Sequence, residues 1–145
     1  MKRAIAGGAL AVGLSITGTG GATAATVPVI YVNAQPGGGS NFVHGKVRPH
    51  GNLYWTCDGS GWFTLRSWSS WSASNAWGKA TTHLRSGPLT SPARTSPSTL
   101  HLYRVRTHDG QRYFTRLHFT LTRPLFGVRS GTLRAYQHGC SAWYY

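Results

Sequence analysis

The sequence predicts an all-β domain, most simply an antiparallel β-sandwich of immunoglobulin-like or similar type, with a small barrel as the alternative. Short runs rich in β-branched and aromatic residues recur between Gly, Pro, Asn and Ser. No long stretch repeats apolar residues at the three-and-four spacing of a helix. Hydrophobic residues make up 40% of the 145 residues, which is enough for the core of one domain and hardly allows a second.

The N-terminus has the features of a secretory signal. Two basic residues precede a short apolar run, and small residues follow up to Ala24. Because a bilayer span needs about 20 apolar residues, cleavage after Ala24 is expected rather than a retained anchor. We therefore expect residues 1–24 to be a signal peptide, and residues 25–145 to form a single secreted domain without a transmembrane segment.

The first half of this domain contains five short strand candidates. The first is β-branched, and its Pro28 suits a strand start or an edge. A flexible turn, QPGGGSN, separates it from the second, and RPHGN and CDGSG separate the next ones. In chain order the candidates are Val27–Val32, Phe42–Val47, Leu53–Cys57, Trp62–Trp68 and Trp77–Leu84.

The second half contains a hairpin whose register can be predicted. Residues 86–99, SGPLTSPARTSPST, have no periodicity and are expected to form one long surface loop. Strands at Leu100–Thr107 and Arg112–Thr122 then flank HDGQ, and Asp109-Gly110 is the preferred dipeptide of a type I′ turn. A last strand is expected around Thr132–Gln137. The turn predicts these cross-strand pairs: Leu102 with Leu117, Leu100 with Phe119, Tyr103 with Arg116, Val105 with Phe114, and His101 with His118.

The only two cysteines are Cys57 and Cys140. In an exported protein, one disulfide between them is the expected state. It would close most of the domain in one loop and stabilise it by about 4 to 5 kcal/mol.

The charge balance is strongly basic: Lys+Arg number 15 against Asp+Glu 2, for a formal net charge of +13. Glutamate is absent, and both Asp58 and Asp109 precede Gly in expected turns. Chemistry that needs a pair of carboxylates is therefore disfavoured, and we expect a protein that is not an enzyme and has no cofactor.

Arginines interleaved with aromatic residues gather on the hairpin, a combination that suits a polyanion. The expected partner is an anionic cell-envelope glycan, such as teichoic acid, or extracellular nucleic acid; otherwise the charge only keeps the protein soluble. The candidate polyanion-binding residues are Arg104, Arg106, Arg112 and Arg116 for charge, with Tyr103 and Phe114 for stacking.

Three further features leave alternatives open. The tryptophan cluster is expected in the core, with a glycan platform as the other interpretation. His101 and His118 are weak candidates for a metal site or a His-based nuclease, without an identifiable third ligand. The 86–99 loop suggests a protein-binding or inhibitor domain, with Arg94 as the anchor. The tryptophans of the cluster are Trp55, Trp62, Trp68, Trp71 and Trp77.

Two stretches resemble small secreted, functionally uncharacterised actinobacterial proteins. They are Arg48–Leu84, with CDGSGWFTLRSWSSW and AWGKATTHL, and Tyr103–Leu117, YRVRTHDGQRYFTRL. Where such proteins often carry a further cysteine pair before the last hairpin, this chain has SGPLTSPARTSP, which supports a single disulfide. The resemblance implies a secreted actinobacterial β-domain and carries over no site residues.

Overall fold

The computed structural model describes residues 26–33, 42–135 and 143–144, and within these ranges every regular element is a β-strand. No helix long and apolar enough to cross a membrane occurs in these ranges. The strands are β1 (Ile30–Asn33), β2 (Phe42–Lys46), β3 (Gly51–Tyr54), β4 (Gly61–Trp71), β5 (Ala76–Leu84), β6 (Arg94–His108), β7 (Gln111–Leu125), β8 (Val128–Ala135) and β9 (Trp143–Tyr144).

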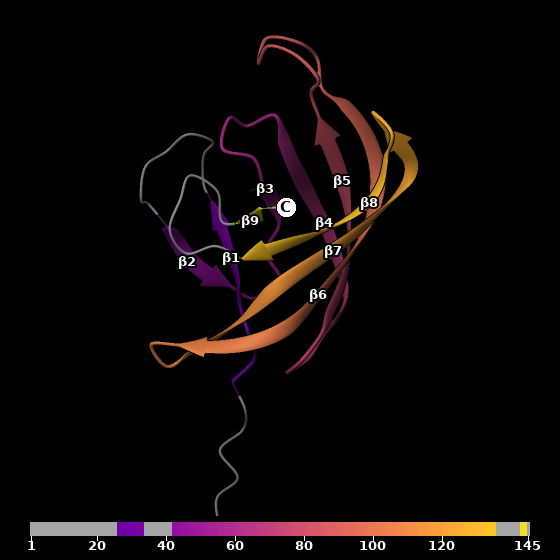
Figure 1. The fold of residues 1–145 in the computed structure, drawn as a ribbon. Helices are drawn as coiled ribbons and strands as arrows, with labels where there is room; N and C mark the ends of the chain where they lie inside the picture. The colour runs from indigo at the N-terminus through magenta and orange to yellow at the C-terminus, as the bar shows by residue number, and fades with distance from the viewer. Residues whose placement is uncertain (1–25, 34–41, 136–142, 145) are drawn as a thin grey trace, which may run out of the picture.

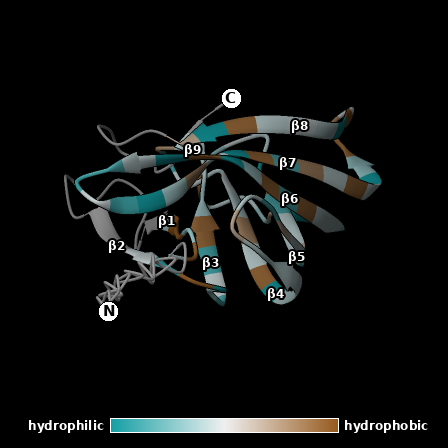
Figure 2. Cartoon of the chain, turned by 90° about the horizontal axis from the view of Figure 1, so that it is seen from below, coloured by the Kyte–Doolittle hydropathy of each residue, from teal (hydrophilic) through white to brown (hydrophobic). Residues whose placement is uncertain are grey.

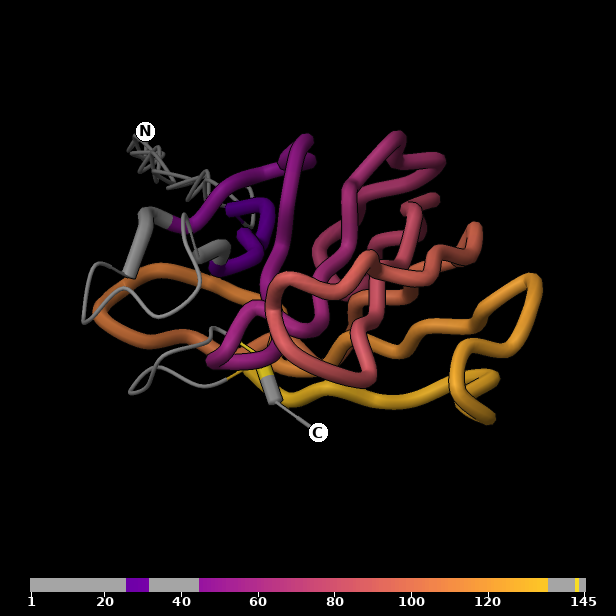
Figure 3. The backbone as a smooth tube through the Cα atoms, turned by 90° about the horizontal axis from the view of Figure 1, so that it is seen from above, coloured from indigo at the N-terminus to yellow at the C-terminus, as the bar shows by residue number. Residues whose placement is uncertain are grey.

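Strands β3 to β9 form one seven-stranded antiparallel sheet in strict sequence order, and β1 pairs with β2 in a separate two-stranded sheet. The large sheet curls into a half barrel, with β1 beside the β6–β7 hairpin (Figures 1 and 3). The all-β class and the antiparallel pairing are thus confirmed. The sandwich is not confirmed, because consecutive hairpins join all seven strands into one continuous sheet instead of dividing them between two.

The core lies on one face of this sheet. Alternation along β4, β5 and β6 sends small or apolar side chains to that face and polar ones to the other. Figure 2 shows hydrophobic and hydrophilic residues alternating along the strands. Cross-strand pairs such as Leu53 with Phe63 and Leu102 with Leu117 are fully buried there. We call the opposite face of the seven-stranded sheet the outer face.

The β6–β7 hairpin has the predicted register. All five predicted pairs are present, from Leu100 with Phe119 to Val105 with Phe114. Both turn residues have positive φ, 47° at Asp109 and 75° at Gly110, as a type I′ turn requires. A local dipeptide therefore sets the alignment of two 15-residue strands.

Arg104 interrupts the regular alternation of this hairpin. Its φ is 55°, in the left-handed region, and its carbonyl accepts a 2.6 Å hydrogen bond from the Thr115 hydroxyl. Beyond this point Tyr113, Phe114 and Thr115 are all buried in succession. The prediction that the Phe114 ring stacks on a ligand is therefore wrong: Phe114 is fully buried in the core.

We expect Arg104→Gly to raise the free energy of unfolding by about 1 kcal/mol, because glycine adopts a positive φ without the Cβ penalty. Arg106→Gly removes the same charge two residues along but should destabilise, since Arg106 is not among the positive-φ residues. Denaturant unfolding of both variants checks this. Equal effects of the two substitutions would contradict strain at Arg104.

The expected loop at 86–99 is shorter in the structure. β6 begins at Arg94, so residues 94–99 pair with β5 rather than forming loop. Ser96 and Ser98 point into the core, where Thr82 donates a 2.8 Å hydrogen bond to Ser98 and Ser98 donates to the carbonyl of Ala80. Because these hydroxyls are satisfied, a Ser- and Pro-rich segment can occupy the middle of a sheet.

The β1 strand is attached to the sheet by backbone and indole hydrogen bonds. Val29 exchanges two 3.0 Å backbone bonds with Arg112 and Phe114 of β7. The indole N–H of Trp71 donates to the carbonyl of Pro28 at 2.9 Å, and that of Trp143 donates to the carbonyl of Tyr31 at 3.0 Å. Segments far apart in the chain are thereby joined through tryptophans.

Some expectations fall on residues outside the described ranges. They are the signal peptide at 1–24, the turn at 35–41, the end of the last strand beyond Ala135, and Cys140. The pairing of Cys57 with Cys140 therefore stays a prediction.

Candidate functional site

A row of Tyr103, Arg116 and Arg134 crosses the outer face. Register places Tyr103 opposite Arg116 on β7, and Arg116 opposite Arg134 on β8. Their neighbours Leu117 and Leu133 are buried on the core face, so alternation sends both arginines to the outer face. Two arginines are thus paired directly across adjacent strands on the same face.

No carboxylate of the described ranges pairs with these arginines. Directly opposed like charges destabilise a sheet, and protein carboxylates usually relieve such pairs. Among the described residues the single ion pair joins His108 to Asp109 at the hairpin tip, and no Lys or Arg takes part in one. In the described part of the chain, the Arg116 guanidinium donates to the adjacent carbonyl of Thr115 at 3.0 Å. The row therefore presents positive charge on the outer face without a described acidic partner.

An aromatic stack adjoins the row. The ring of His101 lies between Trp77 and Tyr103, with centroid distances of 3.9 Å and 5.0 Å and interplanar angles of 5° and 22°. Nε2 of His101 is 2.8 Å from the side-chain oxygen of Asn75, which holds the ring in place. Trp77 is 44% exposed, so the stack presents a preorganised aromatic surface to solvent.

The structure separates the predicted arginines into two groups. Arg104 and Arg106 are exposed on the distal part of the hairpin, and Arg116 lies half-buried in the row. Arg112 instead donates to the carbonyls of Thr26 and Ala73, both at 2.9 Å, and so ties the segment before β1 to the β4–β5 turn. The Arg112 guanidinium therefore stabilises the fold by joining these two segments.

His101 and His118 face each other across β6 and β7, as expected. Their ring nitrogens contact neighbouring side chains: Nε2 of His101 contacts Asn75, and Nδ1 of His118 is 3.0 Å from the hydroxyl of Thr132. In the described part of the chain no three His, Cys, Asp or Glu residues gather in a way that could hold a metal ion.

Burial, and secondarily the nearby His118, lower the pKa of His101 below its ordinary value of 6.5. The unfolded chain therefore binds this proton more readily than the folded protein. The neutral His101 ring therefore contributes to the free energy of unfolding in full above pH 6.5. This contribution is lost as the pH falls through 6.5 toward the pKa of His101 in the folded protein. Thermal unfolding at pH 7.5 and pH 5 should show a larger acid-induced loss for the wild type than for His101→Gln. Equal losses would contradict the shift.

The tryptophan cluster is divided between the two faces. Trp55 is buried in the core, and Trp68 and Trp71 pack against it with their indole N–H groups on backbone carbonyls. Trp62 and Trp77 lie on the outer face, each stacked on a histidine of the neighbouring strand, Trp62 on His83 and Trp77 on His101. The core interpretation thus holds for three of them, and the other two belong to the outer face.

Sequence reasoning missed Arg134 and the histidine–tryptophan stacks. The β7–β8 turn, where Phe126 and Gly127 both have positive φ, is the feature that could have predicted the partner of Arg134. Counting back from this turn gives the wrong partner, however, because the register shifts between Thr120 and Leu125. The signal for the stacks was the alternation of the TrpGlyLysAlaThrThrHis segment at 77–83.

Arg94, the anchor proposed for an inhibitory loop, is the first residue of β6. Its guanidinium lies 4.8 Å from the ring centroid of Phe126 in the β7–β8 turn. Among the residues between β5 and β6, Leu89 is the exposed large apolar side chain, at 54%.

Comparison with known proteins adds no family: no protein-family model, no curated protein and no solved structure matches the chain.

Proposed function

We propose that the protein is an exported, non-catalytic domain that binds an anionic extracellular or cell-envelope polymer through its outer face. Arg116 and Arg134, paired on adjacent strands and without an acidic partner in the described part of the chain, carry this proposal. A bound polyanion would relieve their repulsion, and Tyr103 beside them offers an aromatic contact. Arg104 and Arg106 extend the positive charge along the hairpin.

Export also accounts for the expected Cys57–Cys140 disulfide, which we retain as part of the proposal. In that case the protein without reductant contains no reactive thiol. If two thiols per folded molecule reacted readily with a thiol reagent, the proposed disulfide would be refuted.

The test of function is retention of the protein on heparin, DNA and isolated Gram-positive cell wall across a salt series. Binding through arginines releases counterions, so retention on the preferred polymer should fall steeply as salt rises. Arg116→Gln combined with Arg134→Gln should lower the eluting salt concentration well below that of the wild type.

The matched control is Arg123→Gln combined with Arg129→Gln, which removes the same charge from two exposed positions outside the row. Equal losses in both double variants would mean that only net charge matters. Retention that does not depend on salt would refute the proposal.

A further inference from the structure

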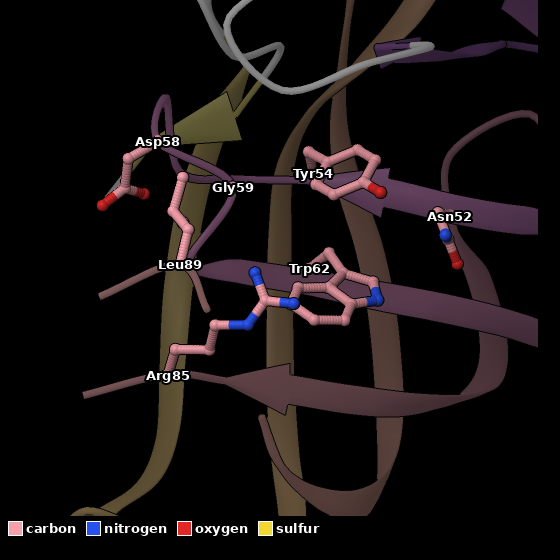
Figure 4. Close-up of a pocket in the computed structure, with 7 residues that line it drawn as sticks. All are labelled: Asn52, Tyr54, Asp58, Gly59, Trp62, Arg85 and Leu89. Atoms are coloured by element: carbon pink, nitrogen blue, oxygen red, sulfur yellow. The ribbon is translucent and has the colours of Figure 1, made fainter. Parts of the chain in front are cut away.

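A pocket opens where β3, β4 and the segment after β5 meet, at the other end of β5 from the Trp77 stack. It measures about 150 Å³, and Figure 4 shows the side chains around it. From Trp77 to His83 the strand advances six residues, about 20 Å, so the pocket and the arginine row are separate sites on the outer face. The lining residues are Asn52, Tyr54, Asp58, Gly59, Trp62, Arg85 and Leu89.

Arg85 is the uncommitted cation of this pocket. Its guanidinium carbon lies 4.9 Å from the centroid of the Trp62 ring. Within the described ranges its Nε is buried without a hydrogen-bond partner, and the guanidinium takes part in no ion pair there. A buried donor without an acceptor is energetically unfavourable. The guanidinium is therefore available to an anionic group that enters the pocket.

Asp58 lies in the same pocket and is one of only two side-chain carboxylates in the chain. The backbone N–H of Ser60 donates to it at 2.9 Å, and this bond above all lowers its pKa, so the carboxylate is ionised at neutral pH. It forms no ion pair with Arg85, and Figure 4 shows its oxygens directed away from the Trp62 ring. An ionised carboxylate accepts hydroxyl hydrogen bonds and repels a dianionic phosphate.

The aromatic wall is held in place by its neighbours. Trp62 stacks on His83 at 4.5 Å and 6°, and Tyr54 lies 6.0 Å from Trp62. Thr64 donates a 2.9 Å hydrogen bond to Asn52 and lies 3.0 Å from Nε2 of His83. Because the hydroxyl proton goes to Asn52, the Thr64 oxygen accepts from His83. The wall is thus preorganised by a polar network beside it.

We propose that this pocket binds one uronic acid unit of an anionic glycan, that is, a sugar ring bearing a single carboxylate. The carboxylate pairs with Arg85, ring hydroxyls donate to Asp58 and exchange hydrogen bonds with Asn52, and the apolar face of the ring packs against Tyr54 and Leu89. This deepens the proposed function by naming the sugar class of the polymer. A phosphate monoester, which is largely dianionic at neutral pH, is repelled by Asp58 more strongly than the singly charged uronate.

The experiment is an NMR titration of the ¹⁵N-labelled protein with glucuronate, glucose, glucose 6-phosphate and inorganic phosphate at fixed salt. Glucuronate should shift the Trp62 indole resonance saturably and bind about tenfold or more tightly than glucose. Arg85→Gln should reduce glucuronate binding to the level of glucose, and Arg85→Lys should restore part of it. The control is Arg66→Gln, which removes an exposed cation of β4 that does not line the pocket and should leave binding unchanged.

Equal binding of glucose 6-phosphate or phosphate would overturn the assignment to a carboxylate sugar. So would glucuronate binding that survives Arg85→Gln in a variant whose spectrum shows an intact fold. Failure here is distinguishable from failure of the proposed function, because polymer retention depends on Arg116 and Arg134. Salt-graded retention without glucuronate binding would refute the pocket alone.

Discussion

Phe119→Ala is expected to lower the free energy of unfolding by about 3 to 5 kcal/mol, a large part of the stability of a domain of this size. Phe119 is fully buried at the centre of the sheet, opposite Leu100, and its ring centroid lies 5.5 Å from that of Phe63 and 6.1 Å from that of Trp55. Truncation removes these contacts and leaves a cavity that three strands surround. Equilibrium denaturation in urea measures the effect.

The matched control is Phe126→Ala. Phe126 is 42% exposed in the β7–β8 turn, and its principal contact is the guanidinium of Arg94. Its loss should cost below about 1 kcal/mol. If both substitutions destabilised equally, the core would not lie where the structure places it.

Trp71→Ala should destabilise by about 3 to 5 kcal/mol and should also loosen β1. The Trp71 ring packs edge-on against Phe114 at 5.5 Å and against Trp68 at 4.6 Å, and its N–H holds the carbonyl of Pro28. Amide hydrogen exchange should show faster exchange at Val29, whose N–H bonds to β7, as well as a lower global stability.

Trp77→Ala removes a tryptophan of the same type from the outer face and serves as the comparison. Because Trp77 is 44% exposed, stability should change little, whereas retention on the preferred polymer should decrease. Unchanged exchange at Val29 in Trp71→Ala, or a stability loss in Trp77→Ala as large as that in Trp71→Ala, would contradict this division of roles.

The parts of the fold that were predictable from sequence are those that local chemistry determines. The Asp109-Gly110 turn aligns Leu100 with Phe119 regardless of what surrounds the hairpin. The alternation at Trp77–Leu84 likewise depends only on the strand period.

The remaining features depend on contacts that no local pattern reveals. The composition of residues 94–99 is typical of a loop. Ser96 and Ser98 are nevertheless buried, because their hydroxyl groups form hydrogen bonds with backbone groups of neighbouring strands. The positive φ of Arg104 changes the alternation, so that Phe114 points into the core. The pairing of Arg116 with Arg134 could not be predicted because the register between Thr120 and Leu125 is irregular. The two partners in each case lie on different strands.

The sequential order of the large sheet has a consequence for how the chain folds. Each strand from β3 to β8 pairs with the one next to it along the chain, so the sheet can grow one hairpin at a time with short loop closures. The attachment of the segment before β1 is different, since the carbonyl of Thr26 meets the guanidinium of Arg112 across 86 positions. Closing so long a loop is entropically costly until the sheet exists to receive it. We therefore expect β1 and the segment before it to dock last, after the β3–β9 sheet has formed.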